Sequence, residues 1–135
     1  MTRSLAIRQA GTALAALGIL TAAAHAATPA GLEAAYSAMA GAPASAERGR
    51  QLFTAAHGRE WSCSSCHGAV PTQAGSHAAT GKPIAALAPA FNAERFADAA
   101  KTEKWFRRNC NDVLGRECSA AEKADVLSWL RTLKP

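Results

Sequence analysis

The chain has 135 residues, with 15 Lys and Arg against 10 Asp and Glu, so its formal net charge is +5 at neutral pH. Removing Arg3 and Arg8, which lie in a leader-like stretch at the N-terminus, lowers this charge from +5 to +3, and a nucleic-acid-binding function gains no support from so small an excess. With only four Phe, three Trp and one Tyr, a domain of this size has a modest core and would gain stability from a bulky apolar cofactor.

The first 26 residues, MTRSLAIRQAGTALAALGILTAAAHA, have the pattern of a secretory signal peptide: basic residues, then an apolar run, then small residues before a cleavage site. The apolar run is shorter than the roughly 20 residues that span a bilayer, so a retained membrane anchor is the less favoured interpretation. We expect an exported, periplasmic protein whose mature chain, residues 27–135, forms one domain without a membrane span.

Two short helices are predicted in the first part of the mature chain. Residues 31–41 place Leu32 and Tyr36 on one face, and a second helix is predicted over residues 46–56 with Ser45 as its N-cap. From residue 60 to 89 the sequence is rich in Gly, Pro, Ser and Thr and has no strand-like alternation. A loop of this length inside a compact domain usually surrounds a bound group, which here would be a cofactor.

Helical signals return in the last third of the chain. Asn92 is expected to cap a short turn, and a helix is predicted to open at Thr102 and to approach its C-terminal end near Arg107. The clearest helix covers residues 120–133, where Ser and Glu at capping-box spacing precede an apolar face. No strand is predicted, so the fold class is all-α with long loops.

The sequence CSSCH, residues 63–67, has the Cys-x-x-Cys-His pattern of c-type haem attachment. In this pattern the thiols of Cys63 and Cys66 add to the two porphyrin vinyl groups, and His67 ligates the iron from the same turn. A redox pair, half of a zinc site and a structural disulfide are the competing interpretations, and none of them uses the adjacent His. One covalently attached haem c is therefore the predicted cofactor.

The residues around this motif resemble a class I cytochrome c fold. Gly49 and Phe53 match the Gly-x-x-x-Phe of that family's first core helix, which crosses a C-terminal helix that Trp129 would supply here. A Gly at such a crossing allows two backbones to approach closely. Pro71, four residues after His67, belongs to a loop of the kind that often gives a backbone carbonyl to the haem imidazole, although a plain turn is equally compatible with it.

The residue on the other side of the iron is less obvious, because no Met follows the haem motif. Met39 precedes it, and Met1 belongs to the leader. The residues alone leave His77, Lys101 or Lys104, Asn109, or no ligand at all as alternatives. Asn109 lies where the chain should return over the distal face, although an Asn near a helix end is more often a C-cap.

A closer resemblance, to a narrower family, suggests which residue is the sixth ligand of the iron. The stretches AERGRQLF, CSSCHG, TGKPIAALAPAFNAERFADAAKTEKWFRRNC and DVLGRECSAAEKADVLSWL are similar to the small SHP-type oxygen-binding cytochrome c family over roughly residues 46–133. In that family an Asn directly before a Cys is the sixth haem ligand, and that Cys pairs with one eight residues later. The resemblance implies Asn109 as ligand, with Asn111 the weaker alternative, and a disulfide between Cys110 and Cys118, which an oxidising compartment also favours.

An amide side chain is a weak neutral ligand that suits ferric iron better than ferrous iron, so reduction should loosen it and open the site to O2, NO or CO. The resemblance also implies redox partners such as a dihaem cytochrome c and a membrane cytochrome b.

A plain electron carrier is one alternative function. A small haem oxidase or nitric oxide scavenger is another, less favoured because an enzyme needs distal proton donors and the distal stretch has no His. Trp105, Arg107 and Arg108 are candidate partners for the haem propionates.

Overall fold

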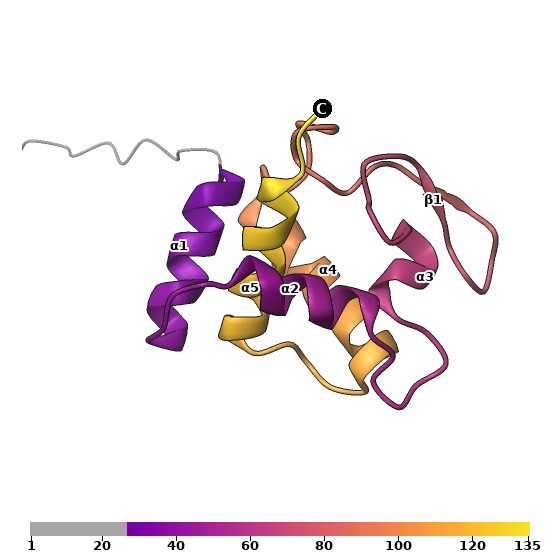
Figure 1. The fold of residues 1–135 in the computed structure, drawn as a ribbon, viewed down its shortest axis with the longest axis horizontal. Coiled ribbons are helices and arrows are strands. Elements are labelled where there is room, and N and C mark those ends of the chain that lie inside the picture. Colours follow the sequence, from indigo (N-terminus) through magenta and orange to yellow (C-terminus); the bar gives the residue numbers. More distant parts are fainter. Residues whose placement is uncertain (1–26) are drawn as a thin grey trace, which may run out of the picture.

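The computed structural model describes residues 27–135; the predicted signal peptide, residues 1–26, lies outside the described residues. Within residues 27–135, five helices and two very short strands follow one another in the order α1 (Pro29–Ala40), α2 (Ala46–Thr54), α3 (Cys63–His67), β1 (Gly75–Ser76), β2 (Pro83–Ile84), α4 (Ala99–Leu114) and α5 (Ala120–Thr132). Figure 1 shows α1, α2 and α5 gathered on one side and the loops that carry α3 and β1 on the other. In the described part of the chain, no helix is both long and apolar enough to cross a membrane.

The helical fold class predicted from the sequence is confirmed, with one small correction. The segment predicted as a loop without strands contains β1 and β2, which pair antiparallel with Gly75 opposite Ile84 and Ser76 opposite Pro83. Two-residue strands leave no room for an alternating pattern, so periodicity could not reveal them. The same segment contains the single helical turn of α3.

The first two helices follow their predicted signals closely. The Thr28 side chain accepts a hydrogen bond from the N–H of Gly31 at the start of α1, and Gly41 ends that helix with a φ of 65°. Ser45 caps α2 as predicted, because its side chain accepts from the N–H of Arg48. Helix α2 ends at Thr54, two residues earlier than expected.

The predicted limits of α4 were wrong at both ends. Asp98 is the N-cap, with its side chain accepting from the N–H of Lys101 at 2.9 Å, so the helix begins before Thr102. It ends only at Gly115, whose φ of 73° is the left-handed conformation that favours Gly. Asn109 therefore lies inside α4, five residues before its last residue, and does not act as a C-cap.

The core is the crossing of α2 and α5. Phe53 of α2 and Leu130 of α5 are almost fully buried, and the rings of Phe53 and Trp129 lie 4.9 Å apart. A Cβ atom at Gly49 would lie 1.9 Å from the carbonyl oxygen of Asp125, so only Gly permits this approach of the two backbones. The close crossing predicted from Gly49 and Phe53 is confirmed.

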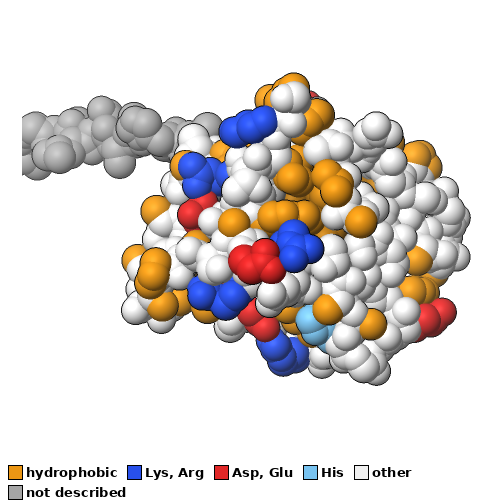
Figure 2. Space-filling view, viewed as in Figure 1, with side chains coloured by type: hydrophobic (Ala, Val, Ile, Leu, Met, Phe, Trp, Pro, Cys, Tyr) orange, Lys and Arg blue, Asp and Glu red, His pale blue; other side chains and the backbone are white. Residues whose placement is uncertain are grey.

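Polar contacts strengthen the same crossing. The buried Asp125 carboxylate accepts from the backbone N–H of Ser45 at 2.6 Å and from Nε of Arg48 at 2.7 Å. A second pair, Arg50 with Glu47, lies on the exposed side of α2. Figure 2 shows basic and acidic side chains interspersed over this face of the molecule, so α2 carries no large patch of a single sign.

Replacing Gly49 with Ala should lower the free energy of unfolding by roughly 2 kcal/mol, because the added methyl group must push α2 away from α5. Urea denaturation followed by far-UV circular dichroism measures this change. Gln51→Ala, an exposed change in the same helix, should alter the stability by less than about 0.5 kcal/mol. Equal stability of Gly49→Ala and wild type would contradict the close contact with Asp125.

The start of α5 is held by a charged capping box. The Ser119 side chain accepts from the N–H of Glu122, and the Glu122 carboxylate accepts in return from the N–H of Ser119 at 2.8 Å. The same carboxylate receives two hydrogen bonds from the Arg116 guanidinium. Arg116, together with the Ser119 N–H, lowers the pKa of Glu122 to about 2.

Because this pKa lies below the value of about 4.3 for Glu in an unfolded chain, the stabilisation from Glu122 is complete above about pH 5. It should disappear as the pH falls from about 4 to 2. Glu122→Gln, which keeps the cap but not the charge, should cost at most about 1 kcal/mol at pH 7 and nothing near pH 2. Urea denaturation at several pH values tests this. Arg116→Leu should remove most of this pH dependence and leave the smaller part that comes from the Ser119 N–H, and an undiminished pH dependence in that variant would exclude Arg116 as the main cause.

Candidate haem-binding site

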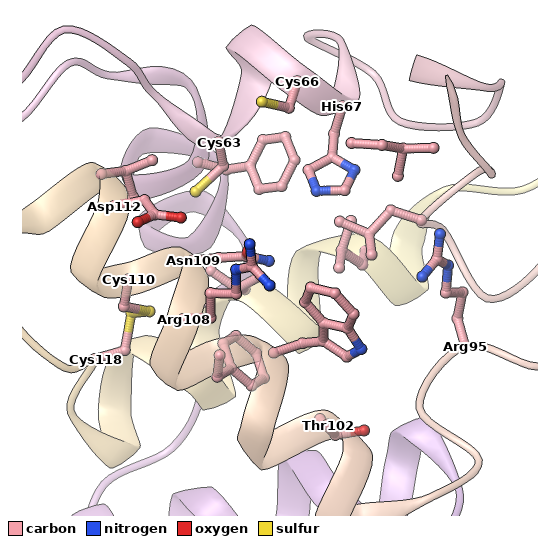
Figure 3. A pocket seen from close by; sticks show the side chains of 18 of the residues that line it. Cys63, Cys66, His67, Arg95, Thr102, Arg108, Asn109, Cys110, Asp112 and Cys118 are labelled. Carbon is pink, nitrogen blue, oxygen red and sulfur yellow. A yellow bond between two sulfur atoms is a disulfide. The ribbon is translucent and has the colours of Figure 1, made fainter. Parts of the chain in front are cut away.

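A cavity of about 660 Å³ lies between α3, α4 and the loop that connects them. Its volume is within the range of roughly 300–1000 Å³ that is usual for small-molecule and cofactor sites. Most of its wall is apolar, with Phe53 and Leu130 from the core and Ile84, Leu87 and Phe106 among the other side chains. Figure 3 shows the polar groups that enter this apolar space from two sides.

Helix α3 supplies the first polar side. Ser62 caps it with a capping box, and its single turn brings Cys63, Cys66 and His67 to the cavity wall. Neither Cys63 nor Cys66 forms a disulfide. Burial raises the pKa of the Cys63 thiol to about 11, while burial and the nearby charge of Arg95 lower the pKa of the His67 imidazole to about 4. His67 is therefore neutral at physiological pH, as a metal ligand must be.

The turn that contains β1 packs directly on α3. A Cβ at Gly75 would lie 2.1 Å from the carbonyl oxygen of Cys66, and the N–H of Ala78 donates to Sγ of Cys66 at 3.2 Å. These contacts hold the second cysteine of the motif in place. Sequence reasoning missed Gly75, because nothing in its neighbours separates a Gly that is needed for close packing from one in an ordinary loop.

The Pro71 carbonyl does not have the role considered for its loop. It accepts hydrogen bonds from the backbone N–H groups of Leu87 and Ala88, at 3.1 and 3.0 Å. Among the described residues, no hydrogen bond involves the ring of His67. The fully buried Pro71 instead connects the middle of the long loop to its last part, at Leu87 and Ala88. These contacts support a purely structural role for Pro71 in its loop, and not a hydrogen bond to the haem imidazole.

Helix α4 forms the opposite wall. Thr102, Trp105, Asn109 and Asp112 all line the cavity, and their spacing of three or four residues places them on one face of the helix. Figure 3 shows His67 entering the cavity from α3 and Asn109 entering from α4, on the other side. The geometry brings together the residues that were predicted as axial ligands.

The other candidate ligands lie in less suitable places. His77 and Lys101 line the cavity, but Lys104 does not. His77 precedes Ala78, whose N–H donates to Sγ of Cys66, so His77 lies on the same side as the haem motif. Its Nδ1 accepts from the N–H of Ala79. Asn111 donates to the backbone carbonyl of Arg107 at 2.8 Å and does not line the cavity.

A disulfide joins Cys110 of α4 to Cys118, which directly precedes the N-cap of α5. The two Cα atoms are 5.5 Å apart, and Cys110 is buried. Because Cys110 follows Asn109 in the chain, the bridge restrains the backbone next to the candidate ligand. The pairing is the one that the resemblance implies.

Arg95 supplies a positive charge without an anionic partner. Its guanidinium donates to the carbonyl oxygens of Ala85 and Ala86 at 2.6 and 2.8 Å, and it forms no ion pair with any carboxylate of residues 27–135. Burial lowers the pKa of Arg95. Figure 3 places Arg95 across the cavity from Cys63. A half-buried, unpaired cation there calls for an anionic group in the cavity.

These residues fit a covalently attached haem. The vinyl groups and the propionates lie at opposite edges of the porphyrin, which matches Cys63 on one side of the cavity and the unpaired Arg95 on the other. The two free thiols, the neutral His67 and the apolar walls satisfy its other requirements. Arg107, one of the side chains considered for the propionates, pairs with Glu117 and does not line the cavity.

Comparisons with known proteins relate the chain to c-type cytochromes. Residues 39–130 match a family described as a domain of unknown function, DUF1924. Over 107 residues the chain is 54% identical to the cytochrome c-type protein SHP of Cereibacter sphaeroides, covering 76% of this chain and 82% of that protein. It is 44% identical over 80 residues to cytochrome c'' of Methylophilus methylotrophus, covering 59% of this chain and 56% of that protein.

Solved structures show the same likeness. The structure of oxidised SHP, an oxygen-binding cytochrome c, matches with a TM-score of 0.75 and 52% identity, covering 80% of this chain and 99% of that chain. Crystalline oxidised cytochrome c'' matches with a TM-score of 0.70 and 34% identity, covering 79% and 95%. A solution structure of cytochrome c'', which addresses the structural basis of haem-ligand detachment, matches with a TM-score of 0.71 and 32% identity, covering 79% and 94%.

The helical fold and the Cys-x-x-Cys-His helix at an apolar cavity define a c-type cytochrome with the class I fold. Its cofactor is covalently attached haem c. Within that class, the chain belongs to the family of SHP-type cytochromes c.

Replacing both Cys110 and Cys118 with Ser should lower the free energy of unfolding by about 2.5 kcal/mol, because the bridge no longer restricts the unfolded chain. Urea denaturation of the haem-containing protein measures the loss. As a control, denatured wild type should keep its haem and take up no iodoacetamide, as judged by mass. Labelling of two thiols in wild type would show that this disulfide is absent.

Proposed function

We propose that this chain is a periplasmic monohaem cytochrome in which His67 and Asn109 are the axial ligands. It accepts electrons, and in the reduced state it binds O2, NO or CO as Asn109 dissociates. The observation that carries the proposal is the position of Asn109, on the cavity face of α4 and opposite His67 (Figure 3). Export by the N-terminal signal peptide belongs to the same proposal.

The two axial residues differ in how firmly the chain holds them. His67 belongs to the same helical turn as both haem-linked cysteines, and β1 packs on that turn at Gly75, so its imidazole stays close to the attachment site. Asn109 depends on a different helix. The described contacts include no hydrogen bond to its side-chain amide, which leaves the amide free to turn toward the cavity or away from it.

A bound haem would supply a redox-active iron, which His67 and Asn109 would hold. A side-chain amide is a weak neutral donor, which ferric iron accepts better than ferrous iron, so reduction favours the release of Asn109. A thioether would keep the position closed in the reduced state. The absence of a Met after the haem motif therefore changes the expected function and not only the spectrum.

The surroundings of Asn109 favour release by rotation of its side chain. The next residue, Cys110, is buried and tied to Cys118, so the backbone of α4 is restrained at this point. One turn earlier, Phe106 packs edge to face against Tyr36 of α1, with ring centroids 6.0 Å apart. Lifting the whole helix would break both contacts, whereas a change of rotamer would break neither.

The comparisons support this proposal. The SHP relative is an oxygen-binding cytochrome, and the structure of cytochrome c'' concerns detachment of a haem ligand. We propose the same behaviour here on the basis of Asn109. The partners implied by the resemblance, a dihaem cytochrome c and a membrane cytochrome b, are the proposed sources of electrons.

Absorption spectra of the ferric and dithionite-reduced protein, with and without CO, test the proposal. Reduced wild type should become high-spin and bind CO, and ferric wild type should be low-spin. Asn109→Ala should already be high-spin or water-ligated in the ferric state, while its reduced form binds CO as wild type does. If reduced wild type stays low-spin and does not bind CO, the proposal is wrong and the protein is a plain electron carrier. A ferric spectrum that Asn109→Ala leaves unchanged would exclude Asn109 as the ligand.

A further inference from the structure

Arg108 is one of four basic side chains that line the cavity, with Lys82, Arg95 and Lys101, and the axial ligands do not explain its role. It lines the cavity directly beside Asn109, and its Cζ lies 5.7 Å from the centroid of the Trp105 ring. Asp112, one turn later on α4, is at the spacing of a helical ion pair, yet Arg108 forms no ion pair with it. The cation–π contact with Trp105 therefore favours a position of the exposed guanidinium at the cavity mouth, where its N–H donors are available.

A propionate is not the best partner for this guanidinium. The unpaired Arg95 lies across the cavity from Cys63, where the edge of the porphyrin away from the vinyl groups would be (Figure 3). Arg108 instead lies next to Asn109 on the α4 wall, opposite His67 (Figure 3). Among residues 27–135, no hydrogen bond to another group uses any of its five N–H donors.

We propose that Arg108, held by Trp105, donates a hydrogen bond to the diatomic ligand that takes the place of Asn109, and so makes the site prefer O2 over CO. The proposal rests on the proposed function, because it needs Asn109 to leave on reduction. O2 gains negative charge when a reduced haem binds it, whereas CO gains much less. A charged donor therefore stabilises bound O2 more strongly than bound CO.

Neighbouring residues provide the variants for a matched test. Arg108→Leu removes the charge and the donors, and Arg108→Lys keeps a charge but loses the planar fork of donors. Arg107 is the control: it is exposed, pairs with Glu117 at 3.4 Å and does not line the cavity. Arg107→Leu therefore makes the same chemical change one residue away, outside the cavity.

The measurements are the dissociation rates of O2 and CO from the reduced haem protein after flash photolysis, and the C–O stretching frequency of the CO complex. Arg108→Leu should speed O2 dissociation by roughly tenfold, the effect of losing one hydrogen bond to a charged group, and change CO dissociation by less than about twofold. The C–O stretch should move to higher frequency. The O2 dissociation rate and the C–O stretching frequency of Arg108→Lys should lie between those of Arg108→Leu and wild type. Arg107→Leu should match wild type in every measurement.

Equal changes for O2 and CO in Arg108→Leu, or a similar change in Arg107→Leu, would overturn the proposal and leave the proposed function intact. A shift in reduction potential with unchanged O2 and CO rates would assign Arg108 to a propionate and would also overturn it. Failure of reduced wild type to bind CO contradicts the proposed function itself, and this inference with it.

Discussion

The close crossing of α2 and α5 at Gly49 is the contact on which the rest of the site depends. Because the two backbones touch there, Phe53 of α2 lies against Trp129 of α5 and also 6.1 Å from the ring of His67. The proximal side of the cavity is thereby connected to the core. Helix α5 is also connected to the other wall, because the residue before its N-cap is Cys118, the disulfide partner of Cys110 in α4. Both walls of the cavity are therefore positioned relative to one helix pair.

Helix α4, which carries Asn109, is attached to the core at separate points along its length. Glu103 pairs with Lys123 of α5 at 2.7 Å, Phe106 packs on Tyr36 of α1, and Cys110 is bonded to Cys118. These contacts hold the backbone of the helix, and none of them involves the side chain of Asn109. A firmly attached helix can therefore present a side chain that is able to leave.

The polar groups of the cavity are divided by position. Cys63, Cys66 and His67 belong to one turn of helix, Asn109 and Arg108 to the opposite wall, and Arg95 to the loop before α4. The proposed roles of the two arginines differ accordingly: Arg95 would face the propionate edge of a bound porphyrin, and Arg108 the position of the diatomic ligand.

Local patterns in the sequence were enough for the parts that depend on local chemistry. The Cys-x-x-Cys-His turn, the caps at Ser45 and Ser119, and the Gly-x-x-x-Phe helix needed only spacing and side-chain type, since each is completed within one or two turns of chain. The assignment of Asn109 and of the disulfide came from family resemblance. The limits of α4 were missed because Asp98 competes well as an N-cap and no residue before Gly115 breaks the helix.

Only the tertiary structure decided which loop residues touch the site. The contact of Gly75 with Cys66 joins segments nine residues apart, and Pro71 accepts from N–H groups 16 and 17 residues later. Arg95 precedes Phe96, an aromatic residue with a φ of 61°, a conformation that its contacts with the core hold in place. The sequence by itself determined the chemistry of haem attachment, because that chemistry is local. Packing decided which charges face the haem cavity, because their positions depend on distant residues.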